Sequence, residues 1–235
     1  MAKVTNGEHI YDNVFKLSVE FEGLCKMGQF FMLRAWDKDP LLSRPLSIYD
    51  FKNNEVSFVY QVVGKGTEIL SRLDEGDDIT LQGPYGNGFP YLKKQSITLV
   101  GGGMGTVPLY YAAKELIRIN PEREISIYLG SRFDSKLLDE FKSSFSNVIT
   151  VIGGMVTDTV QFLEGTAVFT CGPHIMMEKL YNMAKNKNLD MFASVEKRMA
   201  CGVGACLGCT CKTSSGNKRV CKDGPVFSGE EIFYE

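Results

Sequence analysis

Five of the seven cysteines in this 235-residue chain lie near its C-terminus, between Glu196 and Val226. Cys201, Cys206 and Cys209 form a C-x4-C-x2-C run, and Cys221 follows after eleven further residues. This spacing is typical of the four thiolates that hold a plant-type [2Fe–2S] cluster. Glycines between the ligands allow a tight curl whose backbone N–H groups can bond to sulfur. We therefore expect these four cysteines to be metal ligands.

Other interpretations of the cysteines remain open. A structural zinc site usually pairs two C-x2-C knuckles, and only Cys206 and Cys209 have that spacing here. Free core thiols are a second alternative, although they would not be expected among glycines. A disulfide framework is weaker, because cysteines this close rarely meet bridge geometry in pairs. Cys211 is an alternative fourth ligand. We rank Cys221 above it, because the composition of residues 214–217 predicts a hairpin tip that would bring Cys221 back toward the other cysteines.

Two candidate phosphate-binding stretches lie in the first third of the chain. The first is Arg44-Pro45-Leu46-Ser47, in which an arginine fork suits a pyrophosphate and a serine hydroxyl can bond the polar edge of a ring. The second is the glycine-rich turn Gly64–Thr67, which opens a short helix. Taken alone, an Arg-Pro pair is more often a solvated strand edge, and the glycine-rich turn is as often an ordinary loop between strand and helix.

A glycine run in the middle of the chain is a third candidate. Gly101, Gly102, Gly103 and Gly105 follow an apolar strand and precede a helix, where a dinucleotide pyrophosphate can approach the backbone. The run is not a G-x-G-x-x-G, so plain strand–helix packing is the alternative. Cys171 begins a Cys-Gly-Pro motif at the end of a later strand. The alternative without a function is a buried thiol above the start of a helix.

The elements that must position these residues fall into three regions. Residues 1–93 read as short strands, at 14–19, 30–35, 56–62 and 79–82, and predict an antiparallel barrel. In residues 94–192 strands at 97–100, 125–130, 148–152 and 167–170 alternate with helical patterns, which predicts a parallel sheet with covering helices. Thr106 is the expected cap of the first helix. Residues 193–235 form a small cluster domain, so the expected class is β plus α/β.

Composition and charge limit the classes of partner that this chain can bind. The hydrophobic fraction of 44% suffices for a core, and the net charge is −2 without a basic tract. We therefore expect no nucleic acid and no membrane as a partner. No apolar run approaches the roughly 20 residues of a membrane helix. The N-terminal residues lack a signal peptide's apolar core, and an odd number of cysteines argues against a secreted disulfide framework. The expected location is cytoplasmic.

The C-terminal segment resembles the cluster domain of electron-transfer subunits of NAD-dependent dihydroorotate dehydrogenases. The resemblance rests on Glu196 and on residues 198–202, 204–206, 208–209 and 220–227. The order of the Arg-Pro-x-Ser and Gly-x-Gly-Thr motifs is similar to the FAD-binding domain of the ferredoxin-reductase superfamily, which implies a Greek-key barrel. Many members of that superfamily carry tyrosine where Leu46 stands, but this branch resembles the present chain in lacking it.

The resemblance also implies roles for single residues. Arg44, Pro45, Leu46 and Ser47 would hold the FAD pyrophosphate and the flavin edge. Val59, Tyr60 and Gln61 would line the flavin, and Gly66 and Thr67 would hold phosphate. Cys171 would lie near the reacting nicotinamide ring of NAD as a catalytic residue. No acidic residue ends the second strand of the nucleotide region; Arg132 stands there instead and could accept a 2′-phosphate, although the family is NAD-linked.

Together these sites imply an electron relay. Nicotinamide exchanges a hydride, an iron–sulfur cluster exchanges one electron, and a flavin can do either. The resemblance implies that an FMN-containing catalytic subunit, in a heterotetramer of two plus two, passes electrons through [2Fe–2S] and FAD to NAD+ in pyrimidine biosynthesis. The alternatives are the small subunit of a bifurcating NADH/NADP+ oxidoreductase, a reductase for an oxidase, and a zinc-stabilised interaction module without a redox role.

Overall fold

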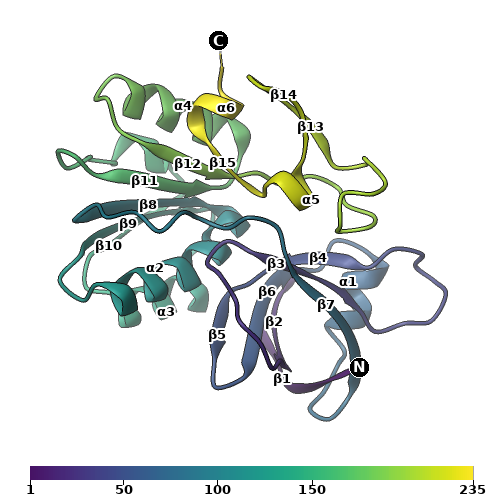
Figure 1. Cartoon of the computed structure of the whole chain (residues 1–235). Coiled ribbons are helices and arrows are strands. Elements are labelled where there is room, and N and C mark those ends of the chain that lie inside the picture. Colours follow the sequence, from purple (N-terminus) through teal and green to yellow (C-terminus); the bar gives the residue numbers. More distant parts are fainter. Residues whose placement is uncertain (235) are drawn as a thin grey trace.

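The N-terminal region of the chain forms an antiparallel sheet that curls on itself (Figure 1). The computed structural model describes residues 1–234. The sheet has seven strands in the order β4-β3-β7-β1-β2-β6-β5. Its edge strands β4 and β5 are joined by only two residues, so the two edges must approach each other. The strands are β1 (Ala2–Tyr11), β2 (Val14–Glu20), β3 (Phe30–Arg34), β4 (Arg44–Ser47), β5 (Asp50–Lys52), β6 (Glu55–Gln61) and β7 (Asp78–Tyr85).

Four of these strands match the ranges expected from the sequence, and α1 (Lys65–Leu70) follows the glycine-rich turn as predicted. Strand β1 was not predicted, because its only buried side chains are Val4 and Ile10, too few for an alternating pattern. The antiparallel sheet is therefore confirmed. The Greek-key barrel stays a prediction.

The second sheet is parallel apart from its last strand. Its order is β10-β9-β8-β11-β12-β15, with α2 and α3 on one face and α4 on the other (Figure 1). The strands are β8 (Ser96–Gly102), β9 (Glu124–Ser131), β10 (Val148–Ile152), β11 (Ala167–Cys171), β12 (Met191–Ser194) and β15 (Val226–Ser228). The helices are α2 (Val107–Ile119), α3 (Lys136–Ser144) and α4 (His174–Lys185), with short 3₁₀ turns η1 (Gly103–Thr106) and η2 (Val156–Asp158).

The alternation of strands and helices in this region is confirmed, with one local correction. Thr106 does not cap α2 with its side chain, because the chain is already helical there as part of η1. Its hydroxyl instead donates to the carbonyl of Gly103 at 3.0 Å. The glycine run and α2 thus form one continuous turn, which fixes the position of the run at the end of β8.

The C-terminal segment lies across both sheets. It contains the hairpin β13 (Thr210–Thr213) and β14 (Gly216–Arg219), followed by α5 (Val220–Asp223) and α6 (Gly229–Ile232). The predicted hairpin tip is thereby confirmed. Strand β15 pairs antiparallel with β12, so this segment completes the second sheet. The predicted domain boundary after residue 192 falls inside β12, and the division of the chain into three domains stays a prediction.

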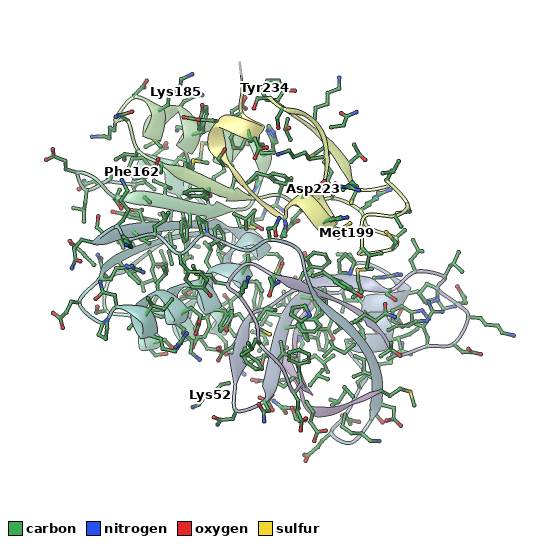
Figure 2. The ribbon with its side chains drawn as sticks, in the orientation of Figure 1. Lys52, Phe162, Lys185, Met199, Asp223 and Tyr234 are labelled. Atoms are coloured by element: carbon green, nitrogen blue, oxygen red, sulfur yellow. The ribbon has the colours of Figure 1, made fainter. Side chains whose placement is uncertain are left out.

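A shared apolar cluster joins this segment to the antiparallel sheet. Phe30 and Met32 of β3 are buried together with Cys209, Val220 and Cys221. Met199 packs on the same cluster, and Asn87, which follows β7, donates to the backbone carbonyl of Asp223 at 3.1 Å (Figure 2). The cysteine-bearing segment is therefore anchored on the first sheet. Among residues 1–234, no helix is long and apolar enough to cross a bilayer.

Candidate cofactor sites

The four cysteines predicted as ligands meet in two pairs. The backbone N–H of Cys206 donates to the sulfur of Cys201 at 3.5 Å, and that of Cys221 donates to the sulfur of Cys209 at 3.4 Å. Cys206 is exposed and Cys201 is half-buried, whereas the Cys209–Cys221 pair is buried. The hairpin of β13 and β14 thus brings Cys221 back to Cys209, as expected if Cys221 is the fourth ligand.

The loop from Cys201 to Cys209 is curled so that N–H groups face sulfur. Gly202, Gly204 and Leu207 all have left-handed backbone conformations, with φ of 71°, 82° and 59°. N–H groups in this curl, that of Cys206 first, lower the pKa of the Cys201 thiol to about 6. Cys201 is therefore a thiolate at neutral pH, which is the form that binds iron.

Paired thiols suit a cluster of two irons better than a single metal ion. Within residues 1–234, no three cysteine, histidine or acidic side chains converge closely enough to hold one ion. A structural zinc site needs four ligands around one centre, whereas a [2Fe–2S] cluster shares four cysteines between two irons. The residues present thus fit the cluster, with inward N–H groups available to its sulfurs.

Cys211 packs against the cluster that contains Cys209 and Cys221, but among residues 1–234 no hydrogen bond joins it to either cysteine pair. It is half-buried on β13 directly opposite Lys218, and its thiol has a raised pKa because it is shielded from water. Lys197 and Glu231 are among its charged neighbours. This position supports the choice of Cys221 as the fourth ligand.

The cysteine loop rests directly on the antiparallel sheet. A Cβ added at Gly202 would lie 2.8 Å from Cγ of Met32 and 3.2 Å from the ring of Tyr85. Met32 in turn pairs with Pro45 across β3 and β4. The cysteine loop therefore packs on β3, the strand that pairs with the Arg-Pro-x-Ser strand.

The two stretches expected to hold FAD phosphates are brought together. A Cβ on Gly66 would fall 2.5–2.7 Å from the guanidinium of Arg44, so only glycine permits this contact. The guanidinium also lies 5.3 Å from the ring of Trp36. Trp36 was not predicted as a site residue, because a lone tryptophan carries no spacing signal. Pro45 sits on an edge strand, where a missing N–H is tolerated. Arg44 and Gly66 thus offer a cationic, closely approachable surface suited to a pyrophosphate.

The other residues expected to contact FAD differ in how far they are buried. The hydroxyl of Thr67 accepts the N–H groups of Val63 and Gly64, so it shapes the turn itself. Val59 and Tyr60 are buried within the protein, while Gln61 is exposed. Leu46 and Ser47 are half-buried on β4. The flavin contacts of these residues stay predictions.

The two nucleotide motifs of the second sheet touch each other. A Cβ on Gly105 would lie 2.3 Å from the carbonyl oxygen of Cys171, and one on Gly102 would lie 2.7 Å from the sulfur of Met176. Gly101 packs against Thr106. Gly103 has a left-handed backbone conformation, with φ of 57°, and open space around its Cα. The glycines therefore serve close backbone packing between η1 and the Cys-Gly-Pro turn, and they leave the loop open on one side.

That open side faces a cleft of about 830 Å³ between the two sheets. It is lined by the glycine loop, by Gly172 and Pro173, by Ser131–Phe133 at the end of β9, and by the turn at 153–157. The first sheet contributes Gln61 and residues 11–14. An elongated cleft at the carboxyl ends of parallel strands is where dinucleotides bind in such sheets. The sequence predicted the glycine side, but not the wall supplied by residues 11–14 or Phe133.

Cys171 and Glu196 lie at one end of this region. Cys171 is buried beneath the cleft, and burial with the charge of Glu196 raises the pKa of its thiol to about 12, so it stays neutral. Glu196 lines the cleft, and poor solvation there raises the pKa of its carboxyl. Gly172, rather than Cys171, forms the cleft wall. A catalytic role for Cys171 stays a prediction.

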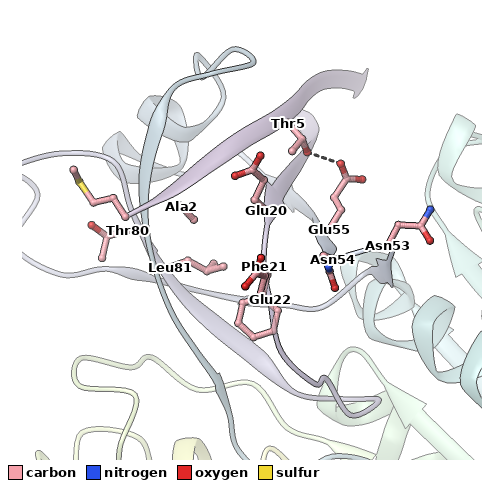
Figure 3. Close-up of a pocket in the computed structure, with 11 residues that line it drawn as sticks. Ala2, Thr5, Glu20, Phe21, Glu22, Asn53, Asn54, Glu55, Thr80 and Leu81 are labelled. Atoms are coloured by element: carbon pink, nitrogen blue, oxygen red, sulfur yellow. Dashed lines mark hydrogen bonds between the residues drawn. The ribbon is translucent and has the colours of Figure 1, made fainter.

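A second hollow, of about 720 Å³, lies on the first sheet (Figure 3). Glu20, Glu22 and Glu55 line it, and the hydroxyl of Thr5 donates to Glu55 at 2.5 Å. Among residues 1–234, no lysine or arginine lines this hollow. Its negative charge disfavours phosphates, so the cleft between the sheets is the better nucleotide site.

Comparison with known proteins agrees with this geometry. Residues 196–233 match the family model of the iron–sulfur cluster binding domain of dihydroorotate dehydrogenase B. The chain is 45% identical to the electron transfer subunit of dihydroorotate dehydrogenase B (NAD(+)) of Clostridium acetobutylicum, covering 98% of this chain and 95% of that protein. It is 41% identical to the corresponding subunit of Clostridium perfringens, covering 98% and 96%.

Solved structures give the same result. The chain resembles the structure of an NADH-dependent reduced ferredoxin-NADP oxidoreductase with a TM-score of 0.88 and 29% identity, covering 99% of this chain and 89% of that one. A ferredoxin NADP+ reductase from Neisseria gonorrhoeae shares the fold, with a TM-score of 0.67 at 14% identity, covering 84% and 93%. With near-complete coverage at 45% and 41% identity, this chain belongs to the family of electron transfer subunits of dihydroorotate dehydrogenase B (NAD(+)).

Proposed function

We propose that this chain connects the catalytic subunit of dihydroorotate dehydrogenase B with NAD+ by means of a [2Fe–2S] cluster, FAD and a nicotinamide site. When bound, the cluster supplies one-electron exchange, the flavin supplies both one- and two-electron exchange, and NAD+ accepts hydride. The chain's own residues hold and orient these groups. Cys201, Cys206, Cys209 and Cys221 supply thiolates, and the curled loop supplies N–H groups to the sulfurs.

The remaining sites follow from the same contacts. Arg44 and Gly66 would hold the FAD pyrophosphate, because the guanidinium lies against a backbone that bears no side chain. The glycine loop would admit the pyrophosphate of NAD, and Pro173 and Gln61 would border its nicotinamide end and shield it from water.

One observation carries the proposal: the candidate sites lie on neighbouring elements. The cysteine loop packs on Met32, whose strand pairs with the Arg44 strand, and Gln61 of the first sheet lines the dinucleotide cleft. Electron transfer requires cofactors held close together, and this arrangement supports such closeness. The exposed tip of the cysteine loop, with Val203 and Leu207 50% and 62% exposed, supports a partner subunit on that side.

The partner would be an FMN-containing catalytic subunit in a heterotetramer of two plus two. Co-expression and purification test this pairing, with NAD+ reduction by dihydroorotate as the assay. We expect the catalytic subunit to reduce NAD+ only when this chain is present. Equal NAD+ reduction by the catalytic subunit alone would contradict the proposal.

A second candidate is the small subunit of an electron-bifurcating oxidoreductase. The likeness to the NADH-dependent reduced ferredoxin-NADP oxidoreductase favours it, as does Arg132 in the cleft. The two candidates differ in their partner. Retention of a dihydroorotate-oxidising subunit during purification supports the first, and NADH-dependent reduction of ferredoxin and NADP+ without dihydroorotate supports the second.

A further inference from the structure

The hairpin between β1 and β2 reaches the dinucleotide cleft. Its tip, Asp12 and Asn13, lines the cleft together with Ser131 and Arg132 from the end of β9. These residues come from different sheets and lie more than 100 positions apart in the chain. The cleft thus has a wall that does not belong to the nucleotide-binding sheet.

Two ion pairs hold this hairpin against the segment that follows β9. Glu8 pairs with Lys136 at 3.9 Å, and Lys16 pairs with Glu140 at 3.5 Å. Both partners follow Arg132 in the chain, at the start and in the middle of α3, so the tip stays next to the end of β9.

The tip itself is fixed in shape. Asp12 has φ of 45°, and its carbonyl accepts a hydrogen bond from the ring Nε2 of His9 at 2.7 Å. The Asn13 amide donates to the carbonyl of Val62 at 3.0 Å and accepts from the side chain of Gln61 at 3.0 Å. The Asp12 carboxylate is therefore carried by a preformed turn, without a side-chain bond of its own among residues 1–234.

The charges near the end of β9 bear on the choice of dinucleotide. An acidic residue after the second strand usually binds the ribose 2′-hydroxyl of NAD, whereas an arginine accommodates the 2′-phosphate of NADP. Here Arg132 follows β9 and makes no hydrogen bond or ion pair with the rest of the described chain. Asp134 does not line the cleft; its carboxylate accepts from the N–H of Ser135 and lies 3.7 Å from Lys142.

We propose that Asp12 supplies the acidic group that the nucleotide-binding sheet lacks, and thereby sets the preference for NAD over NADP. Its carboxylate accepts a hydrogen bond from the ribose 2′-hydroxyl and repels a 2′-phosphate that Arg132 alone would attract. This assignment of a specificity-determining residue rests on the proposed nicotinamide site, and it places that determinant in the FAD-side sheet.

Binding titrations of the cofactor-loaded protein with NADH and NADPH test the proposal. Asp12→Asn should tighten NADPH binding roughly five- to tenfold, because a unit charge near a phosphate is worth about that factor in a water-exposed site. NADH binding should weaken slightly. Asp12→Gly keeps the left-handed turn without strain and should give the same gain for NADPH. The gain should shrink as salt is raised.

Asp134→Asn is the matched control, since it removes the same charge close to Arg132 but outside the cleft. It should leave both dinucleotide affinities unchanged. An equal gain for NADPH in Asp134→Asn, or unchanged NADPH binding in both Asp12 variants, would overturn the proposal. If the unaltered protein bound neither dinucleotide, the nicotinamide site itself would be wrong, which is a separate result.

Discussion

Cys206 and Cys211 stand only five positions apart, yet their surroundings predict opposite effects on substitution. Cys206 belongs to a thiol pair in the curled loop, whereas Cys211 lies on β13 opposite Lys218 and belongs to neither hydrogen-bonded pair. We expect Cys206→Ala to remove the iron and its broad visible absorption while flavin stays bound. Iron and flavin analysis of the purified variant measures this directly.

Cys211→Ala serves as the control, and its iron content should equal that of the unaltered protein. Loss of the cluster in this variant would show that Cys211, rather than Cys221, is the fourth ligand.

Glu196 predicts a pH-dependent stability. Glu196 is exposed, yet the protein that crowds its carboxyl raises the pKa above the ordinary 4.5, so the unfolded chain releases this proton at slightly lower pH than the folded one. Folding therefore loses stability as pH rises above 4.5 through the folded-state pKa, and the loss is complete at higher pH.

Glu196→Gln should remove this loss, so its urea midpoint should exceed that of the unaltered protein at pH 7 by more than at pH 4.5. Equal differences at both pH values would mean that the carboxyl carries no solvation penalty in the fold.

At the scale of elements, β3 links the cysteine loop to the first sheet through Met32. Truncating a buried methionine to alanine costs about 2–5 kcal/mol, because it leaves a cavity. In Met32→Ala that cavity opens directly beneath Gly202, so we expect faster loss of iron to a chelator as well as lower stability. Chelator-dependent bleaching of the visible bands measures the first effect.

Met27→Ala provides the comparison, since Met27 is equally buried but belongs to the main core rather than to the cluster with Cys209 and Cys221. It should lower stability by a similar amount without hastening iron loss. Equal bleaching rates in the two variants would show that the contact between Met32 and Gly202 does not support the loop.

The sequence predicted best those features whose signal is local. The cysteine spacing and the glycine run after β8 specify their own geometry, because ligand spacing and backbone approach involve neighbouring residues. β1 could not be predicted, since only two of its side chains are buried. The cleft wall at Asp12 depends on ion pairs of Glu8 and Lys16 with Lys136 and Glu140, which no local pattern encodes.

At the scale of the whole molecule, polar and aromatic contacts fix one sheet against the other. Lys114 of α2 pairs with Asp50 of β5 at 2.6 Å, and the Tyr49 hydroxyl donates to Glu140 of α3 at 2.5 Å. The rings of Tyr49 and Tyr110 stack with centroids 4.4 Å apart. These contacts hold the FAD-side sheet and the nucleotide-binding sheet in one orientation, so the cleft between them keeps its width.

The same scale explains why a single chain can serve as a relay. The C-terminal segment adds β15 to the second sheet while its cysteine loop packs on the first. The three proposed cofactor sites thereby belong to one folded unit, and the exposed tip of the cysteine loop is available to a partner.

Quantitative analysis of iron, acid-labile sulfide and flavin in anaerobically purified protein tests this account most directly. We predict about two irons and two sulfides per chain, as a [2Fe–2S] cluster requires, together with one flavin. Protein that contains zinc in place of iron and carries no flavin would contradict it.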